Sequence, residues 1–549
     1  MGKTIVGKIV NSMEKVLPAV EPKWEEAQGS MFLNEEYHLQ LAFYTNADCL
    51  GYFPLTVKAD GPLAPYIRFY KQQLVPFTTA WKPADDYYIA DKPCLIPDPL
   101  LDFDLMRFCL PSGQWRAVWV SVRLPENFSA GIYETKFSLC NSAGEALETL
   151  SYEMEVIGAC LPENPLRLTN WLYCDCIAER HHVKPFSKRF YKIFDSYLKT
   201  YVGSGYNMLL TPLFTPPLDT EIGFERLTTQ LVDVTLTGEK YVFDFSNLKK
   251  FIETALSCGI KYIEFSHLFT QWGGKFCPKI VATVNGKKKR IFGWEVASDD
   301  PRYVVFLRSF LPALTAFIDE MKIRERCYFH LTDEPRAEHL ETYKKCADLV
   351  KEYIGDMPIM DALSHYEFFE KGLLDIPVVY TPKYEEFAPH NVKDMMVYNC
   401  CIPATEYYSN RFIHSPSQRT RVLGLQLYET GVQGYLHWGF NFYNAWRSYE
   451  RGLDPYSNTD SDGPFPSGDA FLVYPTKTGA CPSIRSMVAL DGFQDYRTML
   501  LLESLIGKEE TLKILRDWGL TGYKTYLRDG TAHIKFRFFV NEKIKSLIR

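Results

Sequence analysis

The chain has 549 residues, of which 46% are apolar and 23% are charged, and its formal net charge is −6. This composition is typical of a globular protein with two or three domains, and the small net charge argues against a nucleic-acid-binding protein. No apolar run reaches the roughly 18 residues of a membrane span, and residues 1–10 lack the apolar core of a signal peptide. We therefore expect a cytoplasmic protein that binds neither nucleic acid nor membrane.

The 14 cysteines fit reduced thiols in such a compartment. Cys174-x-Cys176 and the adjacent Cys400-Cys401 do not have the spacing of a zinc site, so we predict neither a metal nor a cofactor. The densest basic run is 287–290. It follows Asn285-Gly286, a dipeptide typical of tight hairpin turns, and we interpret it as a solvated hairpin tip.

Residues 1–160 predict an all-β domain. In the run 118–124, valines alternate with residues such as Trp119, which is the period of a half-buried strand. Alternating runs at 133–139 and 152–156 follow at a spacing of roughly ten residues, which favours a β-sandwich.

After a proline-containing linker at 158–165, the pattern changes to strands that alternate with helices. We predict helices at 188–201, 246–259, from 301, at 338–354 and at 417–429. We predict eight strands, at 166–173, 207–213, 261–267, 327–332, 358–361, 377–380, 395–399 and 434–438. This alternation predicts a (β/α)8 TIM barrel over residues 166–510, with an insertion at 269–294. The fold class is thus multidomain, α/β plus all-β, and residues 511–549 form a C-terminal extension whose structure we do not predict.

The fourth predicted strand ends in Asp333-Glu334-Pro335. Because proline lacks a backbone donor, it ends the strand and leaves two acids where the strand surfaces. The carboxyl ends of the strands carry the catalytic residues of such barrels. The structural alternative is that Asp333 only caps the next helix.

The other predicted strand ends carry acids, aromatic residues and amides, without a cluster of His and Cys. This mixture suits a sugar pocket, where carboxylates transfer protons, aromatic faces stack on the ring and amides bind hydroxyls. Core packing, a structural histidine and turn-forming asparagines are the competing interpretations. The candidate substrate-binding residues are His267, Trp272, Tyr380, Trp438, Asn441, Asn444 and Trp446.

Adjacent acids do not fit a conventional retaining glycosidase, which needs two separated carboxylates. Beyond the seventh and eighth predicted strands, the segments 399–403 and 439–446 hold no acid. Adjacent acids suffice where the 2-acetamido oxygen of the sugar itself attacks the anomeric carbon. One acid then stabilises the oxazolinium intermediate, and the other protonates the leaving oxygen and later activates water.

His330-Leu-Thr-Asp-Glu-Pro335 resembles the catalytic strand end of glycoside hydrolase family 123, the β-N-acetylgalactosaminidases. The order of a β-sandwich and a barrel resembles that family too. So do four later segments, at 438–446, 470–475, 482–485 and 491–496. The resemblance implies that Asp333 orients and stabilises the acetamido group and that Glu334 is the general acid/base. We expect Arg485 and Asp491 to be a structural pair.

We therefore expect an exo-acting, retaining hydrolase that removes terminal β-linked N-acetylgalactosamine, or N-acetylhexosamine, from a glycan. Two alternatives remain open. One is a conventional retaining glycosidase on sugars without an acetamido group, with Glu406 or Asp361 as nucleophile. The other is a non-catalytic carbohydrate-binding protein on the same barrel. The sequence does not predict the oligomeric state.

Overall fold

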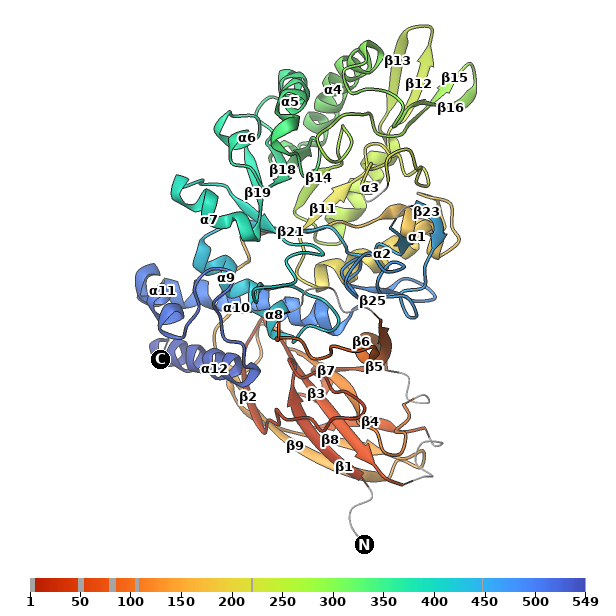
Figure 1. Ribbon diagram of the computed structural model, residues 1–549. Coiled ribbons are helices and arrows are strands. Elements are labelled where there is room, and N and C mark those ends of the chain that lie inside the picture. The colour runs from red at the N-terminus through yellow and green to blue at the C-terminus, as the bar shows by residue number, and fades with distance from the viewer. Residues whose placement is uncertain are drawn as a thin grey trace.

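A computed structural model of the chain describes residues 5–47, 54–78, 85–103, 108–218, 221–446 and 448–548. Part of the N-terminal segment, residues 1–4, therefore lies outside the description. The structure confirms the predicted architecture, an N-terminal β-sandwich followed by a closed barrel of eight parallel strands (Figure 1). The sandwich is red and orange at the bottom of that view, and the barrel lies above it. Within the described ranges, no helix is both long and apolar enough to cross a membrane.

Within its described residues, the sandwich has nine strands in two sheets. The strands are β1 (Ile5–Asn11), β2 (Gln28–Phe32), β3 (Glu36–Thr45), β4 (Thr56–Asp60), β5 (Ile67–Phe77), β6 (Cys94–Asp102), β7 (Arg116–Arg123), β8 (Gly131–Cys140) and β9 (Ala146–Ile157). One sheet has the order β1-β3-β7-β5-β6 and the other β2-β9-β8-β4. Met31, Leu41, Val120 and Phe137 belong to the hydrophobic core of this domain, which strands of both sheets supply.

Strand β7 is not the half-buried strand that its alternation predicts. Val120 belongs to the sandwich core, but Trp119, expected on the solvent side, is also fully buried. It packs against Ile484 and Met487 of helix α10 (Ile484–Ile506). The side chains of β7 do alternate between the two faces of the sheet. Neither face is open to solvent, however, because α10 covers the outer one.

The eight predicted barrel strands are all present. They are β10 (Arg167–Asn170), β11 (Met208–Thr211), β14 (Tyr262–Phe265), β17 (Cys327–His330), β18 (Ile359–Leu363), β19 (Ile376–Tyr380), β20 (Met396–Tyr398) and β21 (Gly434–His437). They pair in this order, and β21 pairs with β10 to close the barrel. Most end a few residues earlier than predicted, so the residues just beyond them belong to the loops at the barrel rim.

The helices follow local signals in the sequence. Ser187 caps the start of α2 (Lys188–Gly203) by accepting from the backbone N–H of Phe190, and Asp300 caps α4 (Pro301–Met321) ahead of Pro301. Gly355, with φ of +64°, ends α5 (Leu340–Ile354). The helix predicted at 417–429 is divided into α8 (Gln418–Arg421) and α9 (Leu423–Thr430). The α-helices besides α10 are α1 (Cys174–Arg180), α2 (Lys188–Gly203), α3 (Ser246–Ser257), α4 (Pro301–Met321), α5 (Leu340–Ile354), α6 (Glu367–Glu370), α7 (Tyr384–Phe387), α8 (Gln418–Arg421), α9 (Leu423–Thr430), α11 (Lys508–Asp517) and α12 (Gly530–Leu547).

The insertions add short strands outside the barrel. A four-stranded sheet contains β13 (Lys240–Asp244), β12 (Asp233–Thr237), β15 (Ile280–Val284) and β16 (Lys287–Phe292). Its β15–β16 hairpin turns at Asn285 and Gly286, both with positive φ, as the dipeptide predicts. Two further hairpins are β22 (Asn444–Ala445) with β23 (Ser448–Gly452) and β24 (Tyr474–Pro475) with β25 (Ala480–Cys481).

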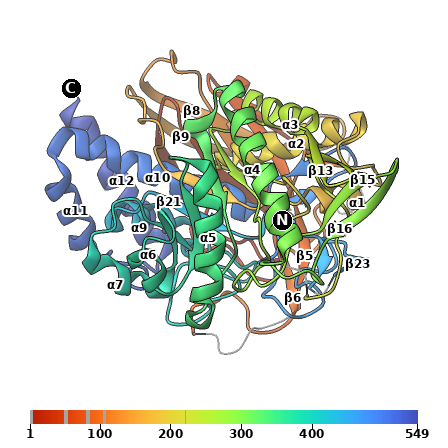
Figure 2. The same cartoon turned by 90° about the horizontal axis from the view of Figure 1, so that it is seen from above.

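The C-terminal extension is helical and packs on both larger parts of the molecule. Helix α11 spans the predicted boundary at residue 510. From α12, Arg537 donates to Asp495 of α10 and to Glu35 of the sandwich, each at 2.7 Å. In Figure 2, α11 and α12 lie on the side of the molecule away from β15 and β16.

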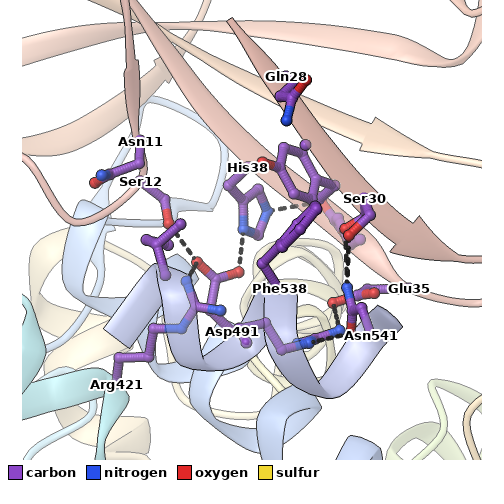
Figure 3. Close-up of a pocket in the computed structure, with 15 residues that line it drawn as sticks. Asn11, Ser12, Gln28, Ser30, Glu35, His38, Arg421, Asp491, Phe538 and Asn541 are labelled. Carbon is purple, nitrogen blue, oxygen red and sulfur yellow. Dashed lines mark hydrogen bonds and ion pairs between the residues drawn. The ribbon is translucent and has the colours of Figure 1, made fainter. Parts of the chain in front are cut away.

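Buried charges also join the sandwich to α10. Around a cavity of about 60 Å³, Asp491 accepts from Ser12 Oγ and binds His38 Nδ1, each at 2.7 Å (Figure 3). Burial alone would lower the pKa of His38, but Asp491 and, to a smaller extent, Glu36 outweigh it and raise the pKa to about 10. Arg485 binds Asp98 of β6 instead, at 2.9 Å. Arg485 and Asp491 are thus both structural, but the expectation that they pair with each other is wrong.

Candidate active site

A cavity of about 170 Å³ opens at the carboxyl ends of the barrel strands. Asp333, Glu334, Trp272, Trp438 and Trp446 are the sequence-predicted residues that the structure brings together there. The remaining lining residues are Trp171, Gln271, Ala362, Tyr398, Asn399, Cys400, Cys401, Leu436 and Phe465.

The two acids share the cavity because the backbone leaves the strand before it reaches them. In an extended strand, neighbouring side chains point to opposite faces. Strand β17 ends at His330, and Glu334 has φ of +45°, a left-handed conformation that costs about 1–2 kcal/mol for a residue with a Cβ. The turn is fixed on both sides: the Glu334 N–H donates to the carbonyl of Ala362 at 3.0 Å, and the Trp272 N–H donates to the carbonyl of Asp333 at 2.7 Å.

Tyr398 is the side chain that holds Glu334. Its hydroxyl donates to Glu334 Oε1 at 2.6 Å, and burial raises the pKa of Tyr398 well above its usual range, so the hydroxyl keeps its proton. The sequence pattern pointed instead to Tyr380, which does not line the cavity and whose ring centroid is 5.5 Å from that of Tyr398. No sequence signal distinguishes Tyr398 from the other apolar residues of its short strand.

The tryptophans occupy two depths. Trp272 and Trp446 are 38% and 41% exposed and lie at the mouth, whereas Trp438 is 7% exposed. Trp438 Nε1 donates to Asp469 at 2.9 Å, and its ring packs on Phe465 with centroids 4.9 Å apart. Trp438 is therefore a rigid part of the cavity wall, whereas Trp272 and Trp446 can contact the parts of a bound ligand that extend out of the cavity.

The loop that carries Trp272 is tightly built. Trp272 has φ of +60°, and Gly273 follows with φ of +100°. A Cβ on Gly273 would lie 2.2 Å from Cγ of His339, so only glycine fits this close approach. The loop after β14 thus packs against the segment that follows the two acids.

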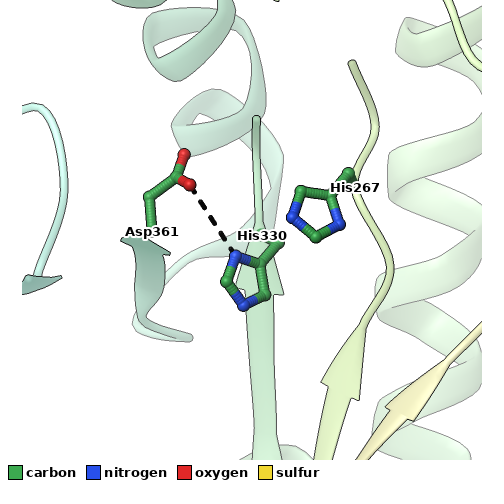
Figure 4. A group of neighbouring side chains, drawn as sticks. All are labelled: His267, His330 and Asp361. Carbon is green, nitrogen blue, oxygen red and sulfur yellow. Dashed lines mark ion pairs between the residues drawn. The ribbon is translucent and has the colours of Figure 1, made fainter. Parts of the chain in front are cut away.

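His267 lies outside the lining, among a buried group of charged residues (Figure 4). Its ring stacks on His330 at 4.4 Å and meets the edge of Trp171 at 5.2 Å. His330 Nε2 is 2.7 Å from Glu264, and its Nδ1 is 3.9 Å from Asp361. Burial alone would lower the pKa of His330, but these two carboxylates raise it to about 9, whereas burial lowers the pKa of His267 well below its usual range. A charged imidazole therefore stacks on a neutral one.

This group also has the composition of a metal site, since one ligand atom from each of His267, His330 and Asp361 falls within 4.8 Å of the others. A histidine binds a metal through a lone pair in the plane of its ring. The two ring planes differ by only 21° and are stacked, so their lone pairs do not converge on one ion. Both His330 nitrogens face carboxylates. The geometry fits a buried ion-pair network and does not fit a metal centre.

The network positions an aromatic wall of the cavity. Trp171 Nε1 donates to Glu264 Oε1 at 2.7 Å, and Thr169 donates to Glu264 Oε2 at 2.5 Å. Glu264, compensated by His330, therefore fixes the indole of Trp171. Neither Trp171 nor Glu264 is among the residues predicted from the sequence. A glutamate inside a buried strand was the available signal for the latter.

The two asparagine candidates bind protein groups beside the cavity. Asn441 is fully buried and bonds both the N–H and the carbonyl of Tyr173, at 2.8 and 3.1 Å. Asn444 is buried and donates to Cys176 Sγ at 3.5 Å. Neither belongs to the residues that line the cavity; both hold the start of α1 against the loop after β21.

The two acids named as alternative nucleophiles also lie away from the lining. Asp361 is fully buried and accepts from the N–H and hydroxyl of Thr332 at 3.0 and 3.1 Å. The side chain of Glu406 is 63% exposed and pairs with Lys524.

A family model described as "Glycoside hydrolase 123, catalytic domain" matches residues 171–502. Among solved structures, a family 123 glycoside hydrolase from Clostridium perfringens, studied for glycolipid glycan hydrolysis, matches with a TM-score of 0.73 at 15% identity, over 99% of this chain and 97% of that one. At this identity the likeness establishes the fold. An endo-β-1,4-mannanase from Thermotoga petrophila matches with a TM-score of 0.36 at 13% identity, over 61% and 78% of the two chains, and is too distant to carry an argument. No curated protein matches the chain.

Proposed function

This chain belongs to glycoside hydrolase family 123, and from that premise we propose that it removes terminal β-linked N-acetylgalactosamine, or a related N-acetylhexosamine, with retention of configuration. The 2-acetamido oxygen of the sugar attacks the anomeric carbon and forms an oxazolinium intermediate. Asp333 orients the acetamido group and stabilises the positive charge of that intermediate. Glu334 protonates the leaving oxygen and then activates the water that opens the ring.

One observation carries this proposal: among the described residues that line the cavity, the carboxylates are Asp333 and Glu334, which are neighbours in the chain. A retaining enzyme with its own nucleophile needs a second carboxylate about 5–5.5 Å from the acid, on the other side of the bond. The wall after β20 instead presents Asn399, Cys400 and Cys401. A nucleophile that belongs to the substrate removes the need for an acid on that wall.

The contact with Tyr398 supports the role given to Glu334. Because the tyrosine hydroxyl donates to Oε1, that oxygen acts as an acceptor, and the proton of the carboxylic acid belongs on Oε2. A general acid needs its proton held in one direction, towards the leaving oxygen.

The size and walls of the cavity support action on a single terminal sugar. About 170 Å³ is below the roughly 300–1,000 Å³ of sites that enclose drug-sized ligands. Trp171 and Trp438 offer flat faces for the C–H groups of a sugar ring. The exposed Trp272 and Trp446 lie where the rest of a glycan would leave the cavity.

The test is a panel of nitrophenyl glycosides with and without a 2-acetamido group, run on wild type, Asp333→Asn and Glu334→Gln. We expect hydrolysis of the N-acetylgalactosaminide, and a loss of ~10²–10⁴-fold in Glu334→Gln that shrinks as the leaving group becomes more acidic. Asp333→Asn should lose activity with every leaving group. Glu406→Gln is the control, since it replaces an exposed acid outside the cavity.

A thiazoline that mimics the oxazoline separates this mechanism from a conventional one. Micromolar or tighter inhibition is expected; indifference to the thiazoline, with a covalent glycosyl-enzyme on another residue, would refute the proposal. The Clostridium perfringens enzyme was studied on glycolipid glycans, so glycolipid glycans that end in N-acetylgalactosamine are the natural substrates to try next.

A further inference from the structure

Two adjacent thiols stand in the wall of the same cavity. Cys400 and Cys401 both line it, with Glu334 and Trp438. Their Sγ atoms are 4.0 Å apart, well beyond the about 2.05 Å of a disulfide bond, and both cysteines are free. Both are half-buried, so a solute that enters the cavity can reach them. Two sulfurs at this separation can be bridged by one atom.

The protein holds this pair in place. The Cys400 N–H donates to the carbonyl of Ile402 at 2.9 Å, which closes the turn around Cys401. The buried side chain of Asn410 donates to the carbonyls of Cys400 and Pro403, each at 3.0 Å. Because the turn is already ordered, a ligand that bridges both sulfurs loses little conformational entropy of the chain.

The two cysteines lie close to the residues that hold the proposed general acid. Cys400 follows Tyr398 by two residues, at the carboxyl end of β20, and Tyr398 is the donor to Glu334. Any group attached to the two sulfurs therefore enters a cavity of about 170 Å³ beside the acid. The hydrolysis proposed above gives neither thiol a role.

We propose that Cys400 and Cys401 form a dithiol site that takes thiophilic ligands of the trivalent organoarsenical class across both sulfurs, and that an occupied site closes the cavity to sugars. In the reaction, two As–S bonds form and two S–H bonds break. The arsenoxide oxygen leaves as water with the two protons, and arsenic stays trivalent. Sulfur is a soft donor, and trivalent arsenic is a soft acceptor that bonds to such donors preferentially.

Cys400 is suited to a ligand that bridges both sulfurs and not to ordinary alkylation. The hydrogen bond with Cys401 and burial raise the pKa of Cys400 well above its usual range, so it stays protonated at neutral pH. Alkylating agents need the thiolate. We expect iodoacetamide to react slowly at Cys400, whereas the arsenical gains a second bond from the neighbouring sulfur of Cys401.

The first experiment adds phenylarsine oxide to the full-length protein and measures adducts by native mass spectrometry, peptide mapping and tryptophan fluorescence. We expect one adduct per chain that maps to residues 400–401, with changed emission from the cavity tryptophans. Cys400→Ser and Cys401→Ser should each weaken binding more than 10-fold. Cys94→Ser, which removes an exposed cysteine of the sandwich, is the matched control and should keep wild-type affinity. Equal adduct formation in wild type and Cys401→Ser would overturn the dithiol site.

The second experiment measures hydrolysis and rests on the proposed function. Phenylarsine oxide should abolish turnover of the N-acetylgalactosaminide, and 2,3-dimercaptopropanol should restore it while an equal concentration of 2-mercaptoethanol should not. An adduct at 400–401 that leaves turnover unchanged would overturn the closing of the cavity. If no glycoside is hydrolysed, the adduct and fluorescence measurements still decide whether the dithiol site exists, so the two proposals fail separately.

Discussion

The hydroxyl of Tyr398 donates a hydrogen bond of 2.6 Å to Oε1 of Glu334. The two residues belong to different parts of the barrel, one to β20 and the other to the loop after β17. Their contact crosses the mouth of the barrel and fixes the direction of a carboxyl group whose backbone is already constrained by a positive φ.

Tyr398→Phe removes this donor and leaves the ring in place. We expect kcat to fall about 10- to 150-fold, since a hydrogen bond to a carboxylate contributes about 1.5–3 kcal/mol. KM should change little, because the proposed role of Tyr398 is to orient the acid. Steady-state kinetics on the nitrophenyl N-acetylgalactosaminide measure both values. Tyr380→Phe tests the rival tyrosine, and a larger loss of kcat in that variant would show that the wrong residue has been chosen.

Glu264→Gln should destabilise the barrel and weaken sugar binding together. It removes a buried charge that compensates His330 and accepts from Trp171. Breaking a buried pair costs about 3–5 kcal/mol, and a misplaced indole should raise KM. Urea unfolding and kinetics check the two effects. Glu225→Gln, in a partly exposed pair with Lys279, should cost at most about 1 kcal/mol, and an equal loss in both variants would contradict the argument.

Two acids of the same strand offer a matched comparison at the contact between the sandwich and the barrel. Asp98 binds Arg485, and both side chains are 1% exposed, whereas Asp102 pairs with Arg68 at the surface. Asp98→Ala leaves an uncompensated buried guanidinium and should cost about 3–5 kcal/mol. Asp102→Ala should cost at most about 1 kcal/mol. Similar unfolding midpoints for the two variants would show that the Asp98 pair does not hold the parts together.

The raised pKa of His38 predicts how the free energy of unfolding depends on pH. Its pKa in the folded protein is about 10, against about 6.5 in an unfolded chain. A raised pKa means that the stabilisation is fully present below about pH 6.5 and is lost as the pH rises to about 10. Thermal unfolding of wild type between pH 6 and pH 10 should show this decline. His38→Gln should show a flatter curve, and a parallel decline in both would assign the effect to other groups.

The sequence predicted the barrel well because each strand is a short apolar run bounded by turn residues, and because the start of a helix is marked locally, as by Pro301 at the start of α4. The alternation of β7 misled in one respect. An alternation with a period of two residues identifies a strand, but it does not show whether a helix distant in sequence, such as α10, covers the second face of the sheet.

Those site residues could be predicted from the sequence whose position in space follows from their position just after a barrel strand. Trp438 follows the end of β21 directly, and Asp333 and Glu334 lie a short loop beyond the end of β17; the barrel places all strand ends on one rim. The contacts of Tyr398 and Trp171 depend on which side chains meet across the barrel, and periodicity carries no such information. Asn441 lies at the rim as predicted, but its amide is occupied by the backbone of Tyr173, which only three-dimensional packing determines.

Because α10 packs over Trp119 of the sandwich, the barrel should not be separable from the sandwich. A truncated version beginning at residue 166 would keep every rim residue, yet it would expose Ile484 and Met487 to solvent and strip Arg485 of its counter-ion. Such a fragment should aggregate or fail to fold, and exchange of the sandwich between relatives should succeed only when α10 is exchanged with it.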